Sequence, residues 1–398
     1  MEINRPNLLI EISDKNFIFI VVKYNEDLDF EILDSLVVKS DGVLDGKIVD
    51  AKISSKILRD NINLIEKKID FSFQNATVIN CQENFSCINI SGYKNLRGSQ
   101  VSREDISYIL NDVKKTISEN EPNKSIIHLF NSNFYLDNSP FDQLPLGLHG
   151  EFYNHHLTFF LLPKNDLKNL KLVLSNSNIN IERVILKSFS EGLKMITDKN
   201  NNNNFIMLNI GKKKSNISIF NNLSFIYYES FNFGTDIIMS DISKVCSLKN
   251  EIVKKIFNEI NFDEISTRDN EYLNKKYFNG EIRKISISHL HDIISSRIEE
   301  IMNITFNKNV NIRNIIKNDH EIYFCYEDSA IIKNYKNIFN KYLSGNFHST
   351  FNSVKKNQPL EASIATANLI GKGWKKEAIP LIQNKKSLIS RIFNTIFN

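Results

Sequence analysis

Two groups of side chains have the residue types and the spacing for chemistry. His149, His155 and His156 lie in a short stretch that also contains Glu151, and imidazole nitrogens with a carboxylate are donors suited to a metal ion. Three consecutive lysines, Lys212 to Lys214, could hold phosphate oxygens as point charges. Both groups also have a plain structural interpretation, as histidines that pack within a fold and as a lysine loop in solvent.

Other common catalytic patterns are not found in the sequence. It contains no G-x-S-x-G nucleophile turn, no P-loop and no Cys-His nucleophile pattern. The cysteines show no C-x-x-C or C-x-x-H spacing, so we expect free buried thiols rather than disulfides or zinc. Aromatic residues do not alternate with a basic face, so we expect no nucleic-acid partner. The four cysteines are Cys81, Cys87, Cys246 and Cys325.

A pattern of three strands separated by short turns occurs twice in the chain. The first copy is predicted at Leu8 to Ile12, Phe17 to Tyr24 and Ile32 to Val38. The second copy is predicted at Phe205 to Ile210, Ile217 to Phe220 and Ser224 to Phe231, after a run of five asparagines that suits a linker. Because helical segments follow each copy, the pattern indicates a duplicated α/β architecture with a cleft between its halves.

A further α+β unit is predicted between the two copies. Ser102 and Asp105 form a capping-box pattern at the start of a helix whose apolar stripe begins at Ile106. Strands are predicted around it at Ala76 to Asn80, Ser86 to Ile90 and Ile126 to Phe130. A second periodic helix runs from about Ile287 to Met302, and its polar face carries Arg297, Glu299 and Glu300.

The last fourteen residues have the pattern of an amphipathic helix. Two interpretations follow, a terminal helix docked on its own domain and an anchor in a membrane interface. From Lys372 onward there are six cations and only one acid, Glu377. Basic residues beside an apolar face favour anionic lipid, so the charge favours the anchor. Its predicted membrane-binding residues are Lys385, Lys386, Leu388, Ile389, Arg391, Ile392, Phe393, Ile396 and Phe397.

Length and composition are those of a globular protein that stays inside the cell. The 398 residues are enough for two domains, and the hydrophobic and charged contents of 41% and 24% are ordinary. The longest wholly apolar run, Phe17 to Val22, is too short to cross a bilayer. Met1 to Asn7 has the charges Glu2 and Arg5 and no hydrophobic region, so we expect no signal peptide.

A central block of the sequence comprises Ile126 to Phe130, Phe134 to Asp137, Leu144 to Gly150 and His155. These residues resemble the "ILH...YxLD...PxGMxGxxL...H" stretch of bacterial FtsA, the actin-like cell-division family. Other motifs occur in the same order as in the family. Gly42, Gly46 and Ile48 to Asp50 resemble its early "GxxxGxVxD" turn, and the basic amphipathic tail resembles its C-terminus. Further similar motifs are Ile90 to Gly92, Ser102 to Ile106, Arg297 to Glu300 and Ala365 to Ala367.

The resemblance implies a duplicated actin-like (ASKHA) α/β fold with an inserted α+β subdomain and a C-terminal amphipathic helix. The implied boundaries are residues 1–75 and 158–199 for domain I, 76–157 for the inserted subdomain, 200–240 and 310–370 for the core of domain II, 241–309 for its subdomain, 371–384 for a linker and 385–398 for the membrane helix.

The resemblance also implies an adaptor function. Proteins of this family tether FtsZ to the cytoplasmic face of the inner membrane at the division site and recruit later division proteins. The inserted subdomain would serve self-association into filaments, and residues 241–309 would bind FtsZ, with Arg297 and Glu300 as candidate contacts. Anionic lipids would be the partners of the C-terminal tail.

The family's ATP and magnesium site is altered in this chain. Where the family has Asp-x-Gly-Thr, the chain has Glu11 to Asp14, and where it has Asp-x-Gly-Gly-Gly-Thr-Thr-Asp, the chain has Asn209 to Asn216. Turns that bind phosphate need glycine so that the backbone can approach the phosphate oxygens, and magnesium is bound through carboxylate oxygens. The adenine-side glycines are replaced by Cys325 to Glu327. The candidate nucleotide-binding residues, at the positions of the family's degraded site, are Glu11, Ser13, Asp14, Asn209, Gly211, Lys212, Ser215 and Gly234.

We therefore expect a binding protein rather than an enzyme, because Asn209 and Asn216 cannot act as anionic ligands of magnesium or its waters. Two alternatives remain. One is a nucleotide-gated actin-like ATPase filament, which would need a phosphate cleft to form despite Ser13 and the lysine run. The other is an adaptor of a pilus or secretion system similar to PilM, against which the basic tail argues.

Overall fold

The computed structural model describes residues 3–198, 203–260, 262, 271–278, 283–315, 320–326, 338–339, 342, 351–355, 359–374 and 376–380. The chain divides into two compact units, which are described separately. Unit 1 contains residues 1–203, 220–227 and 358–398, and unit 2 contains residues 204–219 and 228–357. Much of the asparagine run and the whole predicted membrane helix, 385–398, lie outside the described residues.

The first sheet of unit 1 begins with an antiparallel meander and continues with parallel strands. Its order is β11-β6-β1-β2-β3, in which β1 pairs antiparallel with β2 and parallel with β6. Almost every residue of β1 and β2 is buried, as expected for central strands. The strands are β1 (Pro6–Ile12), β2 (Asn16–Tyr24), β3 (Phe30–Lys39), β6 (Asn75–Asn80) and β11 (Asn180–Leu186).

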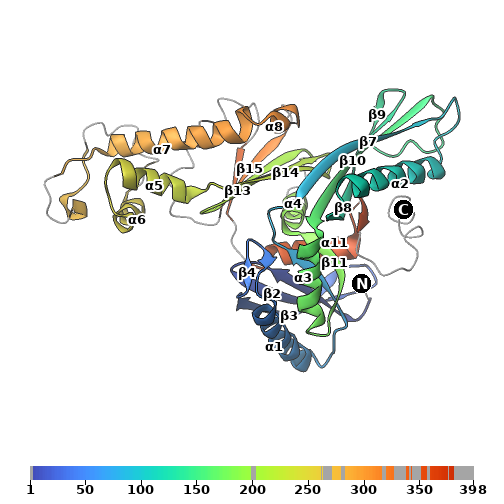
Figure 1. Cartoon of the computed structure of the whole chain (residues 1–398), viewed down its shortest axis with the longest axis horizontal. Helices are drawn as coiled ribbons and strands as arrows, with labels where there is room; N and C mark the ends of the chain where they lie inside the picture. Colours follow the sequence, from blue (N-terminus) through green and yellow to red (C-terminus); the bar gives the residue numbers. More distant parts are fainter. Residues whose placement is uncertain are drawn as a thin grey trace. The chain divides into compact units, whose positions relative to one another are not determined.

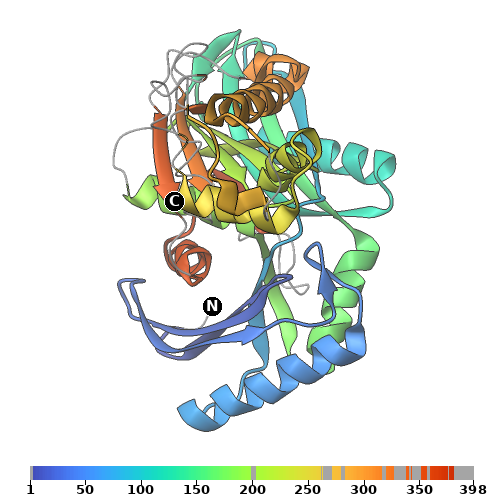
Figure 2. The same ribbon diagram turned by 90° about the vertical axis from the view of Figure 1, so that its left-hand side faces the viewer.

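Helices lie on both faces of this sheet (Figure 2). On one face α11 (Glu361–Lys372) covers an apolar cluster that includes Leu9, Ile20 and Ala367, and the Tyr24 hydroxyl donates to the Ala367 carbonyl oxygen at 2.9 Å. On the other face α1 (Ala51–Ile69) packs against α3 (Lys164–Ser175). Asp50 caps α1, since its carboxylate accepts from the Ile53 amide. Unit 1 also contains α4 (Lys187–Asp198) and the small ribbon β4 (Val43–Leu44) and β5 (Lys47–Ile48).

The second sheet of unit 1 forms the core of the predicted α+β unit (Figure 1). Its order is β17-β8-β10-β7, and β9 pairs with β8. The helix α2 (Arg103–Asn120) packs on it through Ile106, Ile109 and Val113, and the capping box of Ser102 and Asp105 is confirmed. The strands are β7 (Ser86–Asn95), β8 (Lys124–Leu136), β9 (Ser139–Phe141), β10 (Phe152–Pro163) and β17 (Glu377–Pro380).

Several predicted boundaries differ from the structure. The range 310–370 was assigned to the core of domain II, but its end, α11, packs on the first sheet and groups with unit 1. The predicted boundary at residue 158 falls within β10, which pairs in the second sheet along its whole length.

The strand β6 was assigned to the inserted subdomain from residue 76, but it lies in the first sheet between β1 and β11, because its buried run pairs parallel with both. The predicted linker 371–384 contains β17, which pairs antiparallel with β8. The buried Glu377 carboxylate stabilises this pairing, because it bonds His128 on β8 and Arg183 on β11.

Unit 2 contains a third sheet with the same arrangement as the first. Its order is β14-β13-β12-β15-β16, so a meander is again followed by two parallel strands. The predicted duplication is therefore seen in the strand order. The strands are β12 (Phe205–Ile210), β13 (Ser215–Asn221), β14 (Ser224–Phe231), β15 (Glu321–Tyr326) and β16 (Phe351–Lys355); residues 220–227 of the hairpin group with unit 1.

The remaining elements of unit 2 are helical. The predicted helix near Ile287 is confirmed as α7, and it packs against α5. Its buried stripe includes Leu290, Ile294 and Ile298. The elements are α5 (Thr235–Val245), α6 (Asn250–Glu259), the 3₁₀ turn η2 (Lys275–Phe278), α7 (Ile287–Met302), the π turn η3 (Asn303–Asn307) and α8 (Val310–Ile315).

Candidate functional site

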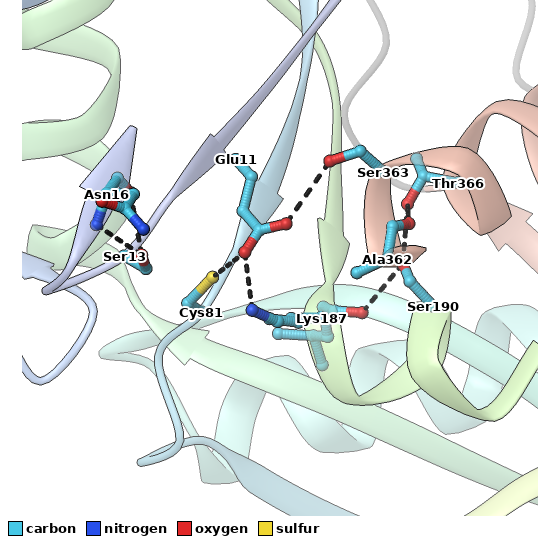
Figure 3. A network of polar contacts seen from close by, with 10 residues as sticks. Glu11, Ser13, Asn16, Cys81, Lys187, Ser190, Ala362, Ser363 and Thr366 are labelled. Carbon is cyan, nitrogen blue, oxygen red and sulfur yellow. Dashed lines mark hydrogen bonds and ion pairs between the residues drawn. The ribbon is translucent and has the colours of Figure 1, made fainter. Parts of the chain in front are cut away.

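In unit 1, three polar side chains meet at the carboxyl ends of the parallel strands (Figure 3). Glu11 is near the end of β1, Cys81 directly follows β6, and Lys187 directly follows β11 as the first residue of α4. Parallel strands end at the same edge of a sheet, and in α/β folds this edge is where ligands bind. The candidate residue Glu11 lies at this edge, with two neighbours that the sequence interpretation did not include.

The Glu11 carboxylate is buried and fully engaged. Only 1% of the residue is exposed. Its Oε1 accepts from the Lys187 ammonium at 2.6 Å and from the Cys81 thiol at 3.6 Å, and its Oε2 accepts from the Ser363 hydroxyl at 3.3 Å (Figure 3). Ser363 lies in the first turn of α11. A buried charge needs partners of this kind to be stable, and here all of them are supplied by the chain.

The charges around Glu11 follow from this burial. Burial and then the Glu11 carboxylate raise the pKa of the Cys81 thiol well above its usual value, so the thiol keeps its proton and donates it. Burial alone lowers the pKa of Lys187, but the carboxylates of Glu11 and Glu191 outweigh it, and the net pKa of the ammonium is raised. The arrangement at neutral pH is an ion pair between carboxylate and ammonium, with a neutral thiol beside it.

The first candidate turn, which follows Glu11, is held by hydrogen bonds within the chain. The Ser13 hydroxyl donates to the Asn16 carbonyl oxygen at 2.8 Å and accepts from the Asn16 amide at 3.1 Å. Asp14 accepts from the amides of Asp45 and Gly46 at 2.7 and 2.6 Å. The sequence interpretation placed the Asp14 charge near a phosphate site; in the structure the carboxylate holds the turn of the β4–β5 ribbon.

In unit 2, the residues at the two lost carboxylate positions contact each other. The Asn209 amide nitrogen donates to Asn216 Oδ1 at 2.7 Å. Two carboxylates at this distance would repel, whereas two amides are attracted. Asn209 is buried, and its own Oδ1 has no hydrogen-bond partner among the described residues. The pair can accept and donate hydrogen bonds, but it has no charge with which to hold a divalent cation.

The second candidate turn is bonded to the start of α5. The amides of Thr235 and Asp236 donate to the carbonyl oxygens of Gly211 and Lys212 at 3.0 and 2.9 Å. A side chain at Gly234 would lie 2.4 Å from both of these oxygens, so glycine is required for the close approach. Helix N-terminal amides are a common anion site, and two of those on α5 are already used within the chain.

Two more candidate residues of this turn have structural contacts. Ser215 is buried, and its hydroxyl donates to the Phe233 carbonyl oxygen at 2.7 Å. Lys212 and Lys213 are exposed. Gly211, Lys212, Ser215 and Gly234 thus lie together, and their polar contacts hold the turn to the segment that leads into α5.

The residues present do not fit a magnesium nucleotide. In unit 1 the carboxylate at the strand ends already has an ammonium at 2.6 Å. In unit 2 the candidate residue Asn209 is an amide that pairs with the amide of Asn216. Divalent cations such as Mg²⁺ are held through oxygen ligands that include carboxylates, and neither unit offers a free one among these candidate residues.

The FtsZ candidates Arg297 and Glu300 lie on α7. Arg297 bonds Asp241 of α5 through Nε and Glu300 through NH1, the latter at 2.5 Å. The hydrogen bond to Asp241 raises the pKa of Arg297, whose charge is thereby tied to α5. Arg297 thus joins two helices, and about half of the Glu300 side chain is exposed.

The histidine group does not form a cluster. His149 bonds the Gly98 carbonyl oxygen at 2.9 Å, His155 donates to Asn131 Oδ1 at 2.9 Å, and the His156 ring contacts Tyr135. The described part of the chain holds no group of three or more His, Cys, Asp or Glu side chains placed to bind a metal. Within that same part, none of the helices has the length and apolar content to cross a membrane.

Sequence reasoning missed a buried cluster of three charged or polar side chains, Glu377, Arg183 and His128. Glu377 of β17 is 3% exposed, and its carboxylate bonds Arg183 of β11 and His128 of β8, the latter at 2.7 Å. His128 Nε2 accepts from the Leu186 amide at 3.1 Å. Burial alone raises the pKa of Glu377, but Arg183 and His128 lower it to about 2. The sequence does show these residues as polar positions within apolar strands. Recognising that they bond one another requires the order of the strands in the sheets.

Comparison with known proteins supports the fold and a distant relationship. No family model matches the chain. The cell division protein FtsA of Buchnera aphidicola is 19% identical over 317 residues, which are 79% of this chain and 75% of that protein. The solved PilM-PilN type IV pilus biogenesis complex matches with a TM-score of 0.54 at 9% identity, over 93% of this chain and 96% of the solved one.

A structure of MreB5 of Spiroplasma citri bound to AMPPNP matches with a TM-score of 0.42 at 12% identity, over 93% of this chain and 95% of that one. The chain is therefore distantly similar to FtsA, and the strand order of the first and third sheets together with the match to the pilus biogenesis complex shows a mixed α/β, actin-like fold.

Proposed function

We propose that this chain is a membrane-tethering adaptor that anchors FtsZ to the cytoplasmic face of the inner membrane at the division site. The observation that carries the proposal is the similarity to FtsA over 79% of the chain. The tail, residues 385–398, is the proposed anchor, and Lys385, Lys386 and Arg391 face the lipid head groups. The chain assembles into filaments and recruits later division proteins.

The proposed adaptor acts by binding rather than by hydrolysis. The Glu11 carboxylate is neutralised by Lys187, and Asn209 and Asn216 form a neutral pair. These contacts support a scaffold that needs no nucleotide. A short amphipathic helix binds lipid reversibly, and several copies joined in a filament would bind far more firmly. Weak single anchors therefore suit a protein that works as an assembly.

Liposome flotation with FtsZ from the same cell tests the proposal. The intact chain should carry FtsZ upward with anionic vesicles, and a chain truncated after Gln383 should not. Ile392→Asn, within the predicted apolar stripe, should weaken flotation, whereas Thr395→Asn on the polar face is the matched control. Absence of vesicle binding by the intact chain would contradict the anchor.

A second candidate function is favoured by the structural match to PilM. In this alternative the chain is an assembly adaptor of a pilus or secretion system. The same flotation assay separates the two, because vesicles that bind the chain but leave FtsZ in solution would support the second candidate. Varying ATP in the assay addresses the remaining alternative, a nucleotide-gated filament, which requires FtsZ or lipid binding to change with ATP.

A further inference from the structure

Unit 1 has a cavity at the amino ends of the parallel strands of its first sheet, at the opposite end of these strands from Glu11. Its volume is about 310 Å³, close to the lower limit of about 300 Å³ for pockets that hold small molecules. This size suits a metabolite as small as an amino acid rather than a nucleotide. The lining comes from residues 5–9 at the start of β1, residues 71–75 and Thr77 before and within β6, Glu182 of β11 and Ile370 of α11.

The cavity lies on the face of the sheet that α11 covers. Leu9 of β1 and Thr77 of β6 are neighbours in the parallel register, and Leu9 belongs to the apolar cluster under α11. Ile370 adds an apolar side chain from α11 itself. The rings of Phe71 and Phe73 add two more, with their centroids 5.2 Å apart in an edge-to-face arrangement. The cavity therefore offers an apolar wall to a ligand.

The acidic residue of the cavity, Glu182, lies at an irregularity in β11. The pairing of β11 with β6 shifts register between Ile181 and Arg183, so Glu182 is the extra residue of a bulge. Bulges redirect a side chain and are common beside functional sites. After burial, the charge of Glu182 helps to raise the pKa of Tyr24, whose hydroxyl bonds α11. The carboxylate charge therefore acts on the face of the sheet where the cavity lies.

The lining carries one charged group of each sign. Glu182 is partly buried, whereas Arg5, directly before β1, is exposed. A carboxylate accepts hydrogen bonds from an ammonium, and a guanidinium donates two parallel hydrogen bonds to a carboxylate. A ligand with both an ammonium and a carboxylate would match the two side chains. Such a ligand has no net charge, and the two side chains together have none either.

We propose that this cavity binds a free α-amino acid with an apolar side chain. The ligand's ammonium bonds the Glu182 carboxylate, and its carboxylate bonds the Arg5 guanidinium. Its side chain packs against Phe71, Phe73 and Ile370. The bound amino acid joins the amino ends of three strands to α11 and so stabilises unit 1. The site is separate from the tail and from α7, so the failure of this inference is distinguishable from that of the proposed function.

Thermal unfolding of the full chain with L-phenylalanine and with L-leucine tests the proposal. At least one of the two should raise the melting temperature by about 5 °C when added at about 100 times its dissociation constant. Phenethylamine lacks the carboxylate and N-acetyl-L-phenylalanine lacks the ammonium. Calorimetric titration should show that each of these single-charge probes binds about tenfold or more weakly than L-phenylalanine. If neither amino acid binds, the inference is wrong.

Two variants separate the roles of the charged side chains. Glu182→Gln should weaken the binding of L-phenylalanine about tenfold and leave that of N-acetyl-L-phenylalanine unchanged, because this probe has no ammonium. Arg5→Gln should weaken L-phenylalanine by a similar factor and leave phenethylamine unchanged, and it should fold because Arg5 is exposed. Glu119→Gln, on the exposed side of α2, is the matched control and should bind like the unmodified chain.

The pattern across the variants decides the outcome. Equal affinity of Glu182→Gln, Arg5→Gln and the unmodified chain for L-phenylalanine would overturn the inference. The same weakening of both single-charge probes in each variant would also overturn it, because one contact for each charge predicts opposite patterns in the two variants.

Discussion

At the scale of single residues, the amide pair Asn209 and Asn216 determines what unit 2 can bind. Replacing both by aspartate would put two carboxylates at hydrogen-bond distance, since the present separation is 2.7 Å. One of them would keep its proton, so its pKa in the folded chain would be raised. The folded chain would then bind more protons than the unfolded chain, and stability would fall as pH rises above about 4.

We expect Asn209→Asp with Asn216→Asp to lower the free energy of unfolding by about 2 kcal/mol at pH 7 and by less at pH 5. The measurement is urea unfolding at both pH values, with each result taken relative to the unmodified chain. A deficit that is equal at the two pH values would mean that the new carboxylates move apart instead of sharing a proton.

Asp14 offers a second test at this scale. It accepts two backbone hydrogen bonds from Asp45 and Gly46, so Asp14→Ala should cost about 1–3 kcal/mol of stability. If the charge faced a phosphate site, its removal would instead increase ATP affinity. Calorimetric titration with ATP and thermal unfolding together separate these outcomes, and tighter ATP binding by the variant would contradict the structural role.

At the scale of elements, β17 is held by its buried charges. Glu377→Gln leaves Arg183 without a charged partner, and breaking a buried ion pair typically costs about 3–5 kcal/mol. We expect faster hydrogen exchange at the Asn131 amide, which donates to the Lys376 carbonyl oxygen next to β17. The exchange rate of this amide reports the detachment of β17 directly.

The control for β17 is a variant that removes both charges. Glu377→Gln with Arg183→Met should recover part of the lost stability, because no unpaired charge remains in the interior. A double variant that is as unstable as the sum of the single ones would show that the two side chains do not act as a pair.

At the scale of the whole molecule, unfolding should become easier in acid. Burial, together with the charges of His156 and Lys376, lowers the pKa of His155 to about 3, and burial lowers the pKa of His128 as well. Both rings are neutral in the folded chain and charge on unfolding. Their contribution to the free energy of unfolding is fully present above about pH 6.5, the pKa of histidine in the unfolded chain. This contribution is lost as the pH falls below that value.

The urea midpoint should therefore fall steadily from pH 6.5 downward, and Glu377 adds a further loss below about pH 4.5. His155→Gln removes one of these groups and should reduce the slope of the midpoint against pH. An unchanged slope in His155→Gln would contradict the assigned cause.

The sequence predicted the elements better than their long-range contacts. Both meanders, the capped helix at Ser102 and the helix from Ile287 were recognisable because local periodicity and capping residues specify them. The ion pair of Glu11 with Lys187 was not, since its partners lie 176 positions apart and meet only once the order β11-β6-β1 is known. The same applies to Glu377 and His128.

The position of α11 and β17 in unit 1 has a consequence for synthesis. Residues 205–355 are translated after the N-terminal strands and before the segment that completes unit 1. On the ribosome, the first sheet and β8 therefore emerge long before the segments that complete them. The face that α11 covers and the strand edge that β17 pairs stay open while unit 2 is translated. Contacts across such long sequence separations form slowly, so unit 1 should reach its final packing only after unit 2 has been translated.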